Sequence, residues 1–260
     1  MGILNVTPDS FSDGGRFAAM EAAVAHAHQM QREGAALIDI GGESTRPGAR
    51  QVGDQEELDR VIPVIEALAS ELRIPLSIDT SKPQVMREAV AAGAGLINDV
   101  MALRVPGAVE AAAGLKVPVC LMHMQGQPRT MQRSPQYEDV VVDIRDFLVE
   151  RIDVCLKAGI PADRILIDPG FGFGKTLEHN LALLKNLAAF RELEVPVLVG
   201  ISRKSMIGAL LGEVPVDERL FGSIAAAVLA VREGAAVIRT HDVRATVDAL
   251  KVVAAVESLA

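Results

Sequence analysis

The segment REGAALIDIGGE, residues 32–43, contains the pattern that decides the fold. Gly34 follows a helical stretch, the nearly continuous apolar run 36–40 carries Asp39 near its end, and two glycines come next. Glycine commonly takes the left-handed position that ends a helix. An apolar run without alternation is typical of a parallel strand covered on both faces. The segment therefore predicts a helix end, a turn, a buried strand and a polar strand end.

The same pattern recurs along the whole chain. The apolar runs are residues 2–6, 36–40, 76–79, 95–98, 118–122, 165–168, 197–200 and 237–240, with helical periodicity between them. Eight βα repeats in about 250 residues predict an α/β fold, a (β/α)8 TIM barrel, as a single domain over residues 1–260. A doubly wound open sheet is the alternative, but it typically has fewer strands, and no GxGxxG follows the first run.

The composition excludes several classes of protein. Acidic residues number 34 and basic ones 26, and this net charge of −8 argues against nucleic-acid binding, which needs a basic surface. No apolar stretch reaches the ~18 residues of a membrane span, and no signal segment is recognisable. Cys120 and Cys155 sit in apolar runs and are expected to be buried free thiols. We expect a cytoplasmic protein, with further residues upstream because the chain opens directly on an apolar run.

Polar residues stand at nearly every predicted strand end. They are Asn5, Asp39, Asp79, Asn98 with Asp99, His123 after Met122, Asp168, Ser202 to Lys204, and Arg239 with His241. Any one of them is explained by a helix N-cap or a loop hydrogen bond. Caps do not require a mixture of carboxylates, amides and cations, so the whole set predicts a ligand site at the carboxyl-terminal mouth of the barrel.

The residue types indicate the ligand. Arg46, Arg239 and His241 suit an anion such as phosphate. Asp79, Asn98 and Asp168 offer acceptors and donors to a nitrogen-rich planar heterocycle.

The loop PGFGFGK, residues 169–175, is not a phosphate-binding P-loop, because that motif needs glycine at position 169. We therefore expect Lys175 to be a helix-start or surface residue. The long polar loops after the first two strands are candidate lids.

Eight motifs resemble the dihydropteroate synthase family. They are MGILNVTPDSFSDGG (1–15), DIGGESTRPGA (39–49), SIDTSKP (77–83), IND (97–99), LMHMQG (121–126), IDPGFGFGK (167–175), GISRKS (200–205) and IRTHDV (238–243). They are long, family-specific and spread over nearly the whole chain. The resemblance implies condensation of 6-hydroxymethyl-7,8-dihydropterin diphosphate with p-aminobenzoate, giving dihydropteroate and pyrophosphate by an SN1-like substitution. It also implies Mg2+, a homodimer formed through C-terminal helices, and inhibition by sulfonamides.

The resemblance also implies roles for single residues. The pterin-binding set is Asp79, Asn98, Met122, Asp168 and Lys204. The diphosphate contacts are Asn5, which also contacts Mg2+, with Arg46, Arg239 and His241. The p-aminobenzoate pocket is Phe11, Ser44, Thr45, Pro47 and Phe173. The expected catalytic residues are Asp168, Lys204, Arg239 and His241, whereas Arg203 is left out.

Three other functions compete with this interpretation. A methyltetrahydrofolate-dependent methyltransferase would share the pterin-binding acids but has no use for a diphosphate clamp. A non-catalytic pterin-binding paralogue should have lost part of the loop motifs, which are intact here. Schiff-base chemistry at Lys204, as in barrel aldolases, needs a depressed pKa, and nearby carboxylates oppose that. Lys204 as a simple helix-start cation stays an alternative.

Overall fold

Parallel strands form a closed barrel in the computed structural model, which describes residues 1–6, 15–44, 50, 52–126 and 130–259. The strands are β1 (Gly2–Asn5), β2 (Ile38–Gly41), β3 (Leu76–Asp79), β4 (Leu96–Asp99), β5 (Val119–Met122), β6 (Ile165–Asp168), β7 (Leu198–Val199) and β8 (Val237–Ile238). The first six pair in chain order, and β7 pairs with β8. Parallel bridges from Ile167 to Val197 and from Gly2 to Thr240 join the two sheets and close the ring.

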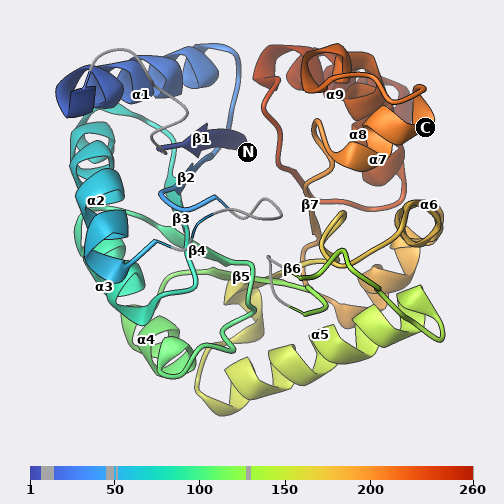
Figure 1. Ribbon diagram of the computed structural model, residues 1–260, viewed down its shortest axis with the longest axis horizontal. Coiled ribbons are helices and arrows are strands. Elements are labelled where there is room, and N and C mark those ends of the chain that lie inside the picture. The colour runs from blue at the N-terminus through green and yellow to red at the C-terminus, as the bar shows by residue number, and fades with distance from the viewer. Residues whose placement is uncertain (7–14, 45–49, 51, 127–129, 260) are drawn as a thin grey trace.

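Helices surround the barrel on the outside (Figure 1). They are α1 (Gly15–Arg32), α2 (Asp54–Glu71), α3 (Pro83–Ala91), α4 (Ala108–Leu115), α5 (Val140–Lys157), α6 (Leu177–Lys185), α7 (Ser205–Leu210), α8 (Leu220–Arg232) and α9 (Val243–Glu257). Short 3-10 turns lie at η2 (Ala162–Arg164), η3 (Leu187–Leu193) and η4 (Val216–Glu218).

The strand alternation separates the core from the site. Successive side chains of a strand point to opposite faces, so Ile38, Ile40 and Ile78 join the aliphatic core between the barrel and the helices, where all three are fully buried. Burying one such side chain contributes roughly 1.5–3 kcal/mol. Asp39 and Asp79 occupy the alternate positions and turn into the barrel interior. The core-facing isoleucines therefore fix the orientation of the site carboxylates.

The predicted (β/α)8 barrel is confirmed, and each predicted strand is present. The last two are shorter than the predicted runs 197–200 and 237–240, and Val197 and Thr240 at the outer ends of these runs form isolated bridges to β6 and β1 instead. Both cysteines are buried free thiols, as expected. Within the described part of the chain, each helix is too short or too polar to span a bilayer.

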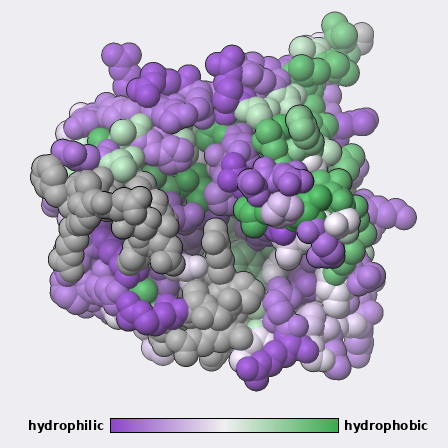
Figure 2. Space-filling view, turned by 45° about the horizontal axis from the view of Figure 1, so that its top comes forward, coloured by the Kyte–Doolittle hydropathy of each residue, from purple (hydrophilic) through white to green (hydrophobic). Residues whose placement is uncertain are grey.

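Apolar side chains are exposed on and around α7, α8 and α9. Figure 2 shows hydrophobic residues gathered at the upper right, where these helices lie. Phe221 is 81% exposed, and Leu229, Val252 and Val256 are also exposed. Large exposed apolar patches commonly mark interaction surfaces.

Candidate active site

The barrel brings the predicted strand-end residues to one mouth. Asn5, Asp79, Asn98, Met122 and Asp168 lie at or next to the ends of β1, β3, β4, β5 and β6. Lys204 follows β7, and Arg239 and His241 follow β8. Parallel strands in a barrel all end on the same face, so these side chains converge although they are distant in sequence.

Arg239 is the central cation of this mouth. Its Nε donates to Asp39 Oδ2 at 2.6 Å, and its Nη2 donates to Asp79 Oδ2 at 2.9 Å. Asn98 Nδ2 also donates to Asp39 Oδ2, at 3.0 Å. The guanidinium therefore reaches from the end of β8 to β2 and β3, and its plane is fixed by two carboxylates.

Burial and charge shift the pKa values of this group in opposite directions. Burial raises the pKa of Asp79 to about 7, although the Arg239 guanidinium opposes the shift. Burial by itself would lower the pKa of Arg239, but the carboxylates of Asp39 and Asp79 raise it above its usual value. Arg239 therefore stays charged, while the charge of Asp79 depends on pH near neutrality.

Asp39 is the site residue for which the sequence predicts no role beyond a polar strand end. Its side chain is fully buried, and Oδ1 has no hydrogen-bond partner among the described residues. An unsatisfied buried oxygen is uncommon outside functional sites. Its position at the end of an apolar run, matching that of Asp79, is the signal that could have identified it.

Asp168 and Lys204 come from β6 and from the loop after β7, next to the strand that precedes Arg239. Asp168 Oδ1 accepts from Gly170 N at 2.7 Å, and burial raises the pKa of Asp168 while Lys204 opposes that shift. Lys204 Nζ donates to Phe171 O and lies 4.2 Å from the centre of the Phe173 ring. Burial lowers the pKa of Lys204 to about 8, partly offset by Asp168. Lys204 precedes α7, but its side chain turns into the site rather than toward solvent.

His241 and Arg203 lie on the loops after β8 and β7. His241 Nδ1 is 3.1 Å from Ser202 Oγ, which also accepts from the His241 backbone N–H at 3.1 Å. Arg203 instead pairs with Asp242 through Nε, at 2.9 Å, and through Nη2. Arg203 therefore ties two loops together, which agrees with its omission from the expected catalytic residues.

Lys175 corrects one expectation. It does stand directly before the Thr176 N-cap of α6, but it is only 3% exposed and is not a surface residue. Its ammonium is held by two backbone carbonyls and His123 inside the β6–α6 loop. A lysine in a glycine-rich loop resembles a solvent-exposed turn residue, and only the folded loop reveals the internal acceptors.

The predicted p-aminobenzoate pocket is described only in part. Phe173 lies beside Lys204, and Ser44 is partly buried after β2. Phe11, Thr45, Pro47 and the predicted diphosphate ligand Arg46 lie outside the described residues.

The donor chemistry around Asn5 fits Mg2+ carried by a diphosphate. A Cβ on Gly41 would lie 3.9 Å from Asn5 Oδ1 and 3.7 Å from Asp79 Oδ2, so a side chain at this position would occupy part of the space that both oxygens border. Across the described residues, no cluster of three or more His, Cys, Asp or Glu side chains could hold a metal alone. Mg2+ needs only one or two protein oxygens when phosphates and waters complete its shell.

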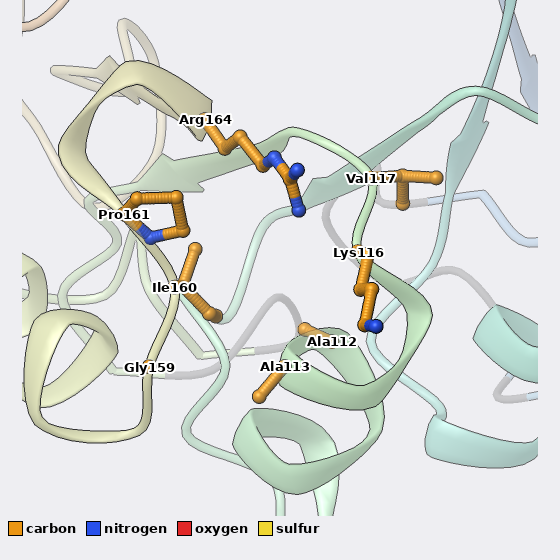
Figure 3. Close-up of a pocket in the computed structure, with 8 residues that line it drawn as sticks. All are labelled: Ala112, Ala113, Lys116, Val117, Gly159, Ile160, Pro161 and Arg164. Atoms are coloured by element: carbon orange, nitrogen blue, oxygen red, sulfur yellow. The ribbon is translucent and has the colours of Figure 1, made fainter.

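A cavity of about 370 Å³ lies away from this mouth (Figure 3). Its lining comes from the end of α4 and from the segment between α5 and β6, including Lys116 and Arg164. These segments lead into the amino-terminal ends of β5 and β6, on the face of the barrel opposite the site. None of the predicted site residues lines it.

Comparison with known proteins gives one consistent result. The family described as pterin binding enzyme matches residues 1–241. The dihydropteroate synthase of Escherichia coli (strain K12) is 56% identical over 255 residues, covering 98% of this chain and 90% of that protein.

Solved structures agree with the sequence match. The Xanthomonas albilineans dihydropteroate synthase with 4-aminobenzoic acid superposes with a TM-score of 0.95 at 58% identity, covering 100% of this chain and 93% of that one. The Yersinia pestis dihydropteroate synthase in a sulfonamide drug complex gives a TM-score of 0.95 at 56% identity, covering 99% and 94%. The chain therefore belongs to the family of pterin-binding enzymes and, within that family, to the dihydropteroate synthases.

Proposed function

We propose that this barrel mouth condenses 6-hydroxymethyl-7,8-dihydropterin diphosphate with p-aminobenzoate, releasing 7,8-dihydropteroate and pyrophosphate. The observation that carries the proposal is the convergence of buried Asp79, Asn98 and Asp168 with the cations Arg239 and Lys204. Acidic groups suit the N–H donors of a pterin edge, and cations suit the diphosphate. A ligand that carries both a pterin ring and a diphosphate accounts for the presence of both kinds of group in one site.

The pterin ring binds at the buried acidic groups. Asp79 and Asp168 accept the ring N–H donors, and Asn98 pairs with the remaining polar edge. Met122 packs against the ring face, and Lys204 donates to a ring acceptor. A ring without those N–H groups leaves buried carboxylates unpaired, at about 1–3 kcal/mol for each lost partner. This penalty provides the specificity.

The diphosphate binds at Asn5, Arg46, Arg239 and His241. The two carboxylate bonds of Arg239 hold its guanidinium plane before the ligand arrives, so little reorganisation accompanies the reaction. Asn5 would hold Mg2+ together with the diphosphate. When bound, Mg2+ supplies Lewis-acid stabilisation of the leaving group's negative charge.

The carbon–oxygen bond breaks first, and its electron pair leaves with pyrophosphate. The pterin ring donates electron density to the methylene carbon left behind, and the Asp168 carboxylate stabilises the developing positive charge. The p-aminobenzoate amine then forms the carbon–nitrogen bond and releases one proton. Because the neutral amine needs position rather than a strong base, the protein's main contribution at this step is alignment.

The aryl ring of p-aminobenzoate packs in a pocket that includes Phe173 and Ser44. Phe173 is held beside the Lys204 ammonium, 4.2 Å from its ring centre. Phe11, Thr45 and Pro47 complete the pocket by resemblance to the family. A filled pocket excludes water, which would otherwise capture the carbon as the alcohol.

The exposed apolar residues of α8 and α9 support a homodimer. The exposed side chains of Phe221, Leu229, Val252 and Val256 are all apolar, and a second copy of the chain could cover them. We also propose that the barrel acts as a single domain in the cytoplasm.

The reaction is tested by measuring pyrophosphate release from purified protein with Mg2+ and both substrates. We expect turnover that stops on removal of either substrate or of Mg2+ with a chelator. Asp168→Asn should lower kcat by about 10²–10³-fold, as for loss of one electrostatic stabiliser. Lys185→Met, at an exposed position on α6, is the control and should keep full activity.

Two outcomes would redirect the assignment. Pterin binding without pyrophosphate release would make the chain a non-catalytic pterin-binding protein. Methyl transfer from methyltetrahydrofolate, without use of the diphosphate, would place it among the methyltransferases.

A further inference from the structure

The β6–α6 loop is folded tightly against the segment that follows β5. Its glycines Gly170, Gly172 and Gly174 have φ values of +71°, +79° and +64°. A Cβ on Gly170 would lie 1.9 Å from His123 O, and one on Gly174 would lie 2.7 Å from Gln125 O. The backbones touch at these two points, where Gly170, Gly174 and Lys175 are buried, so the buried carbonyls of the loop need donors within the protein.

Lys175 supplies those donors. Its Nζ donates to Gly170 O at 2.8 Å and to Phe173 O at 3.0 Å, and it lies 3.0 Å from His123 Nδ1. An ammonium has three donors for these three partners; burial lowers the pKa of Lys175 well below its usual value, but the neutral amine still has two N–H donors for the two carbonyls. Burial, with Lys175 and Arg104, lowers the pKa of His123 to about 2, so the imidazole is neutral, and in its Nε2–H tautomer Nδ1 accepts from Lys175.

The two carbonyls held by Lys175 belong to parts of the loop that serve the site. The peptide of Gly170 also donates its N–H to Asp168 Oδ1 at 2.7 Å. Phe173 places its ring against the Lys204 ammonium. At 3% exposure Lys175 itself is sealed beneath the loop and does not reach the substrates.

We propose that Lys175 is a positioning residue. By bonding the Phe173 carbonyl it fixes the Phe173 ring relative to Asp168 and Lys204, and it thereby controls the binding of p-aminobenzoate without contacting that substrate. The inference rests on the proposed function. Loss of the ammonium leaves the Phe173 carbonyl without its donor, and the ring loses its fixed position.

The pterin side of the site should be largely insensitive to this change. Asp168 is the last residue of β6 and pairs with Met122 in the strand ladder. Its carbonyl also accepts from His123 N at 2.9 Å. These bonds hold the Asp168 backbone independently of Lys175, and Asp79 and Asn98 lie on other strands, so the predicted defect falls mainly on p-aminobenzoate.

The experiment compares Lys175→Met with the wild type and with Lys185→Met as the matched control. Lys175→Met should raise the KM for p-aminobenzoate on the order of 10-fold or more and lower kcat, since small misplacements at a site are costly in rate. Affinity for the pterin diphosphate, measured by calorimetry, should stay within about 2-fold, because that side is held by the strand ladder. Lys175→Gln keeps N–H donors on a shorter side chain and should give an intermediate KM.

Three results would overturn the proposal. The first is a lower melting temperature with an unchanged KM for p-aminobenzoate, and the second is an equal loss of affinity for both substrates. The third is failure of both variants to fold, which would make Lys175 a residue of general stability. A wild type that releases no pyrophosphate would instead refute the proposed function, so the two failures are distinguishable.

Discussion

The charged side chains at the barrel mouth are paired with side chains of opposite charge. Arg239 contacts two carboxylates, and Lys204 lies near a third, Asp168. Removing one partner of such a buried pair typically costs 3–5 kcal/mol, because it leaves an uncompensated charge. The acidic groups and the cations therefore stabilise each other before any substrate binds.

Asp79 makes pterin binding depend on pH. Its pKa is raised to about 7, mainly by burial and against the Arg239 guanidinium, so we expect its protonated fraction in the free protein to grow as pH falls through neutrality. Because ring N–H groups need an ionised acceptor, affinity should fall as pH drops, by at most about tenfold per unit. Calorimetry between pH 5.5 and 8.5 would measure this, with 6-hydroxymethyl-7,8-dihydropterin as ligand so that no phosphate titrates.

The matched variant is Asp79→Asn, which cannot ionise. It should bind the same ligand more weakly than the wild type at pH 8, and its affinity should be nearly independent of pH. A flat profile in the wild type would contradict the assignment of Asp79 as the titrating acceptor.

Among the elements, the β6–α6 loop is held by side chains from several neighbouring segments. Tyr137 Oη donates to Gly174 O at 2.8 Å, and Asn180 Oδ1 accepts from Gly172 N at 2.7 Å. A capping box between Thr176 and His179 then starts α6. The loop is thus held along its whole length, which suits an element that positions an aromatic wall of the site.

Gly170→Ala tests how closely this loop must pack. Gly159→Ala is the control, because Gly159 has a similar φ of +87° but nothing within 4 Å of an added Cβ. The control should lose about 1 kcal/mol for the left-handed conformation alone. Gly170→Ala should lose roughly 1–3 kcal/mol more, because the new methyl group would overlap His123 O. Urea unfolding measures both, and equal losses would show that the loop can relax.

In the whole molecule, the barrel places the site and the exposed apolar residues on different parts of its surface. The site lies at the carboxyl ends of the strands, whereas the exposed apolar residues lie on the outer helices α8 and α9. Changes on that surface should therefore affect assembly more than catalysis.

Phe221→Asp is expected to weaken the proposed dimer by at least about 10²-fold in its dissociation constant, as for loss of an aromatic hot spot. Sedimentation velocity over a concentration series measures this. Val149→Asp on α5 is the control, since Val149 is also exposed but lies far from α8 along the ring. A wild type that stays monomeric at every concentration would refute the dimer.

Much of the site was predictable because it depends on strand ends. The continuous apolar runs identify each strand, and parallel strands in a barrel must end on one face. The residues Asp79, Asn98, Asp168, Arg239 and Lys204 are therefore brought together by topology alone. The surroundings of Lys175 were not predictable, because a charged residue in a glycine loop looks exposed until its acceptors are known.

The barrel, its helix-to-strand order and the chemical types at its mouth follow from the amino-acid sequence, because periodicity and residue type are local properties. Which side chains pair with one another at the site depends on the tertiary structure. Arg239 meets Asp39 and Asp79 across 200 and 160 residues of chain, and Lys175 meets His123 across 52. Hydrogen bonds form over about 3 Å, so such pairings exist only after packing has closed the ring and buried the groups together.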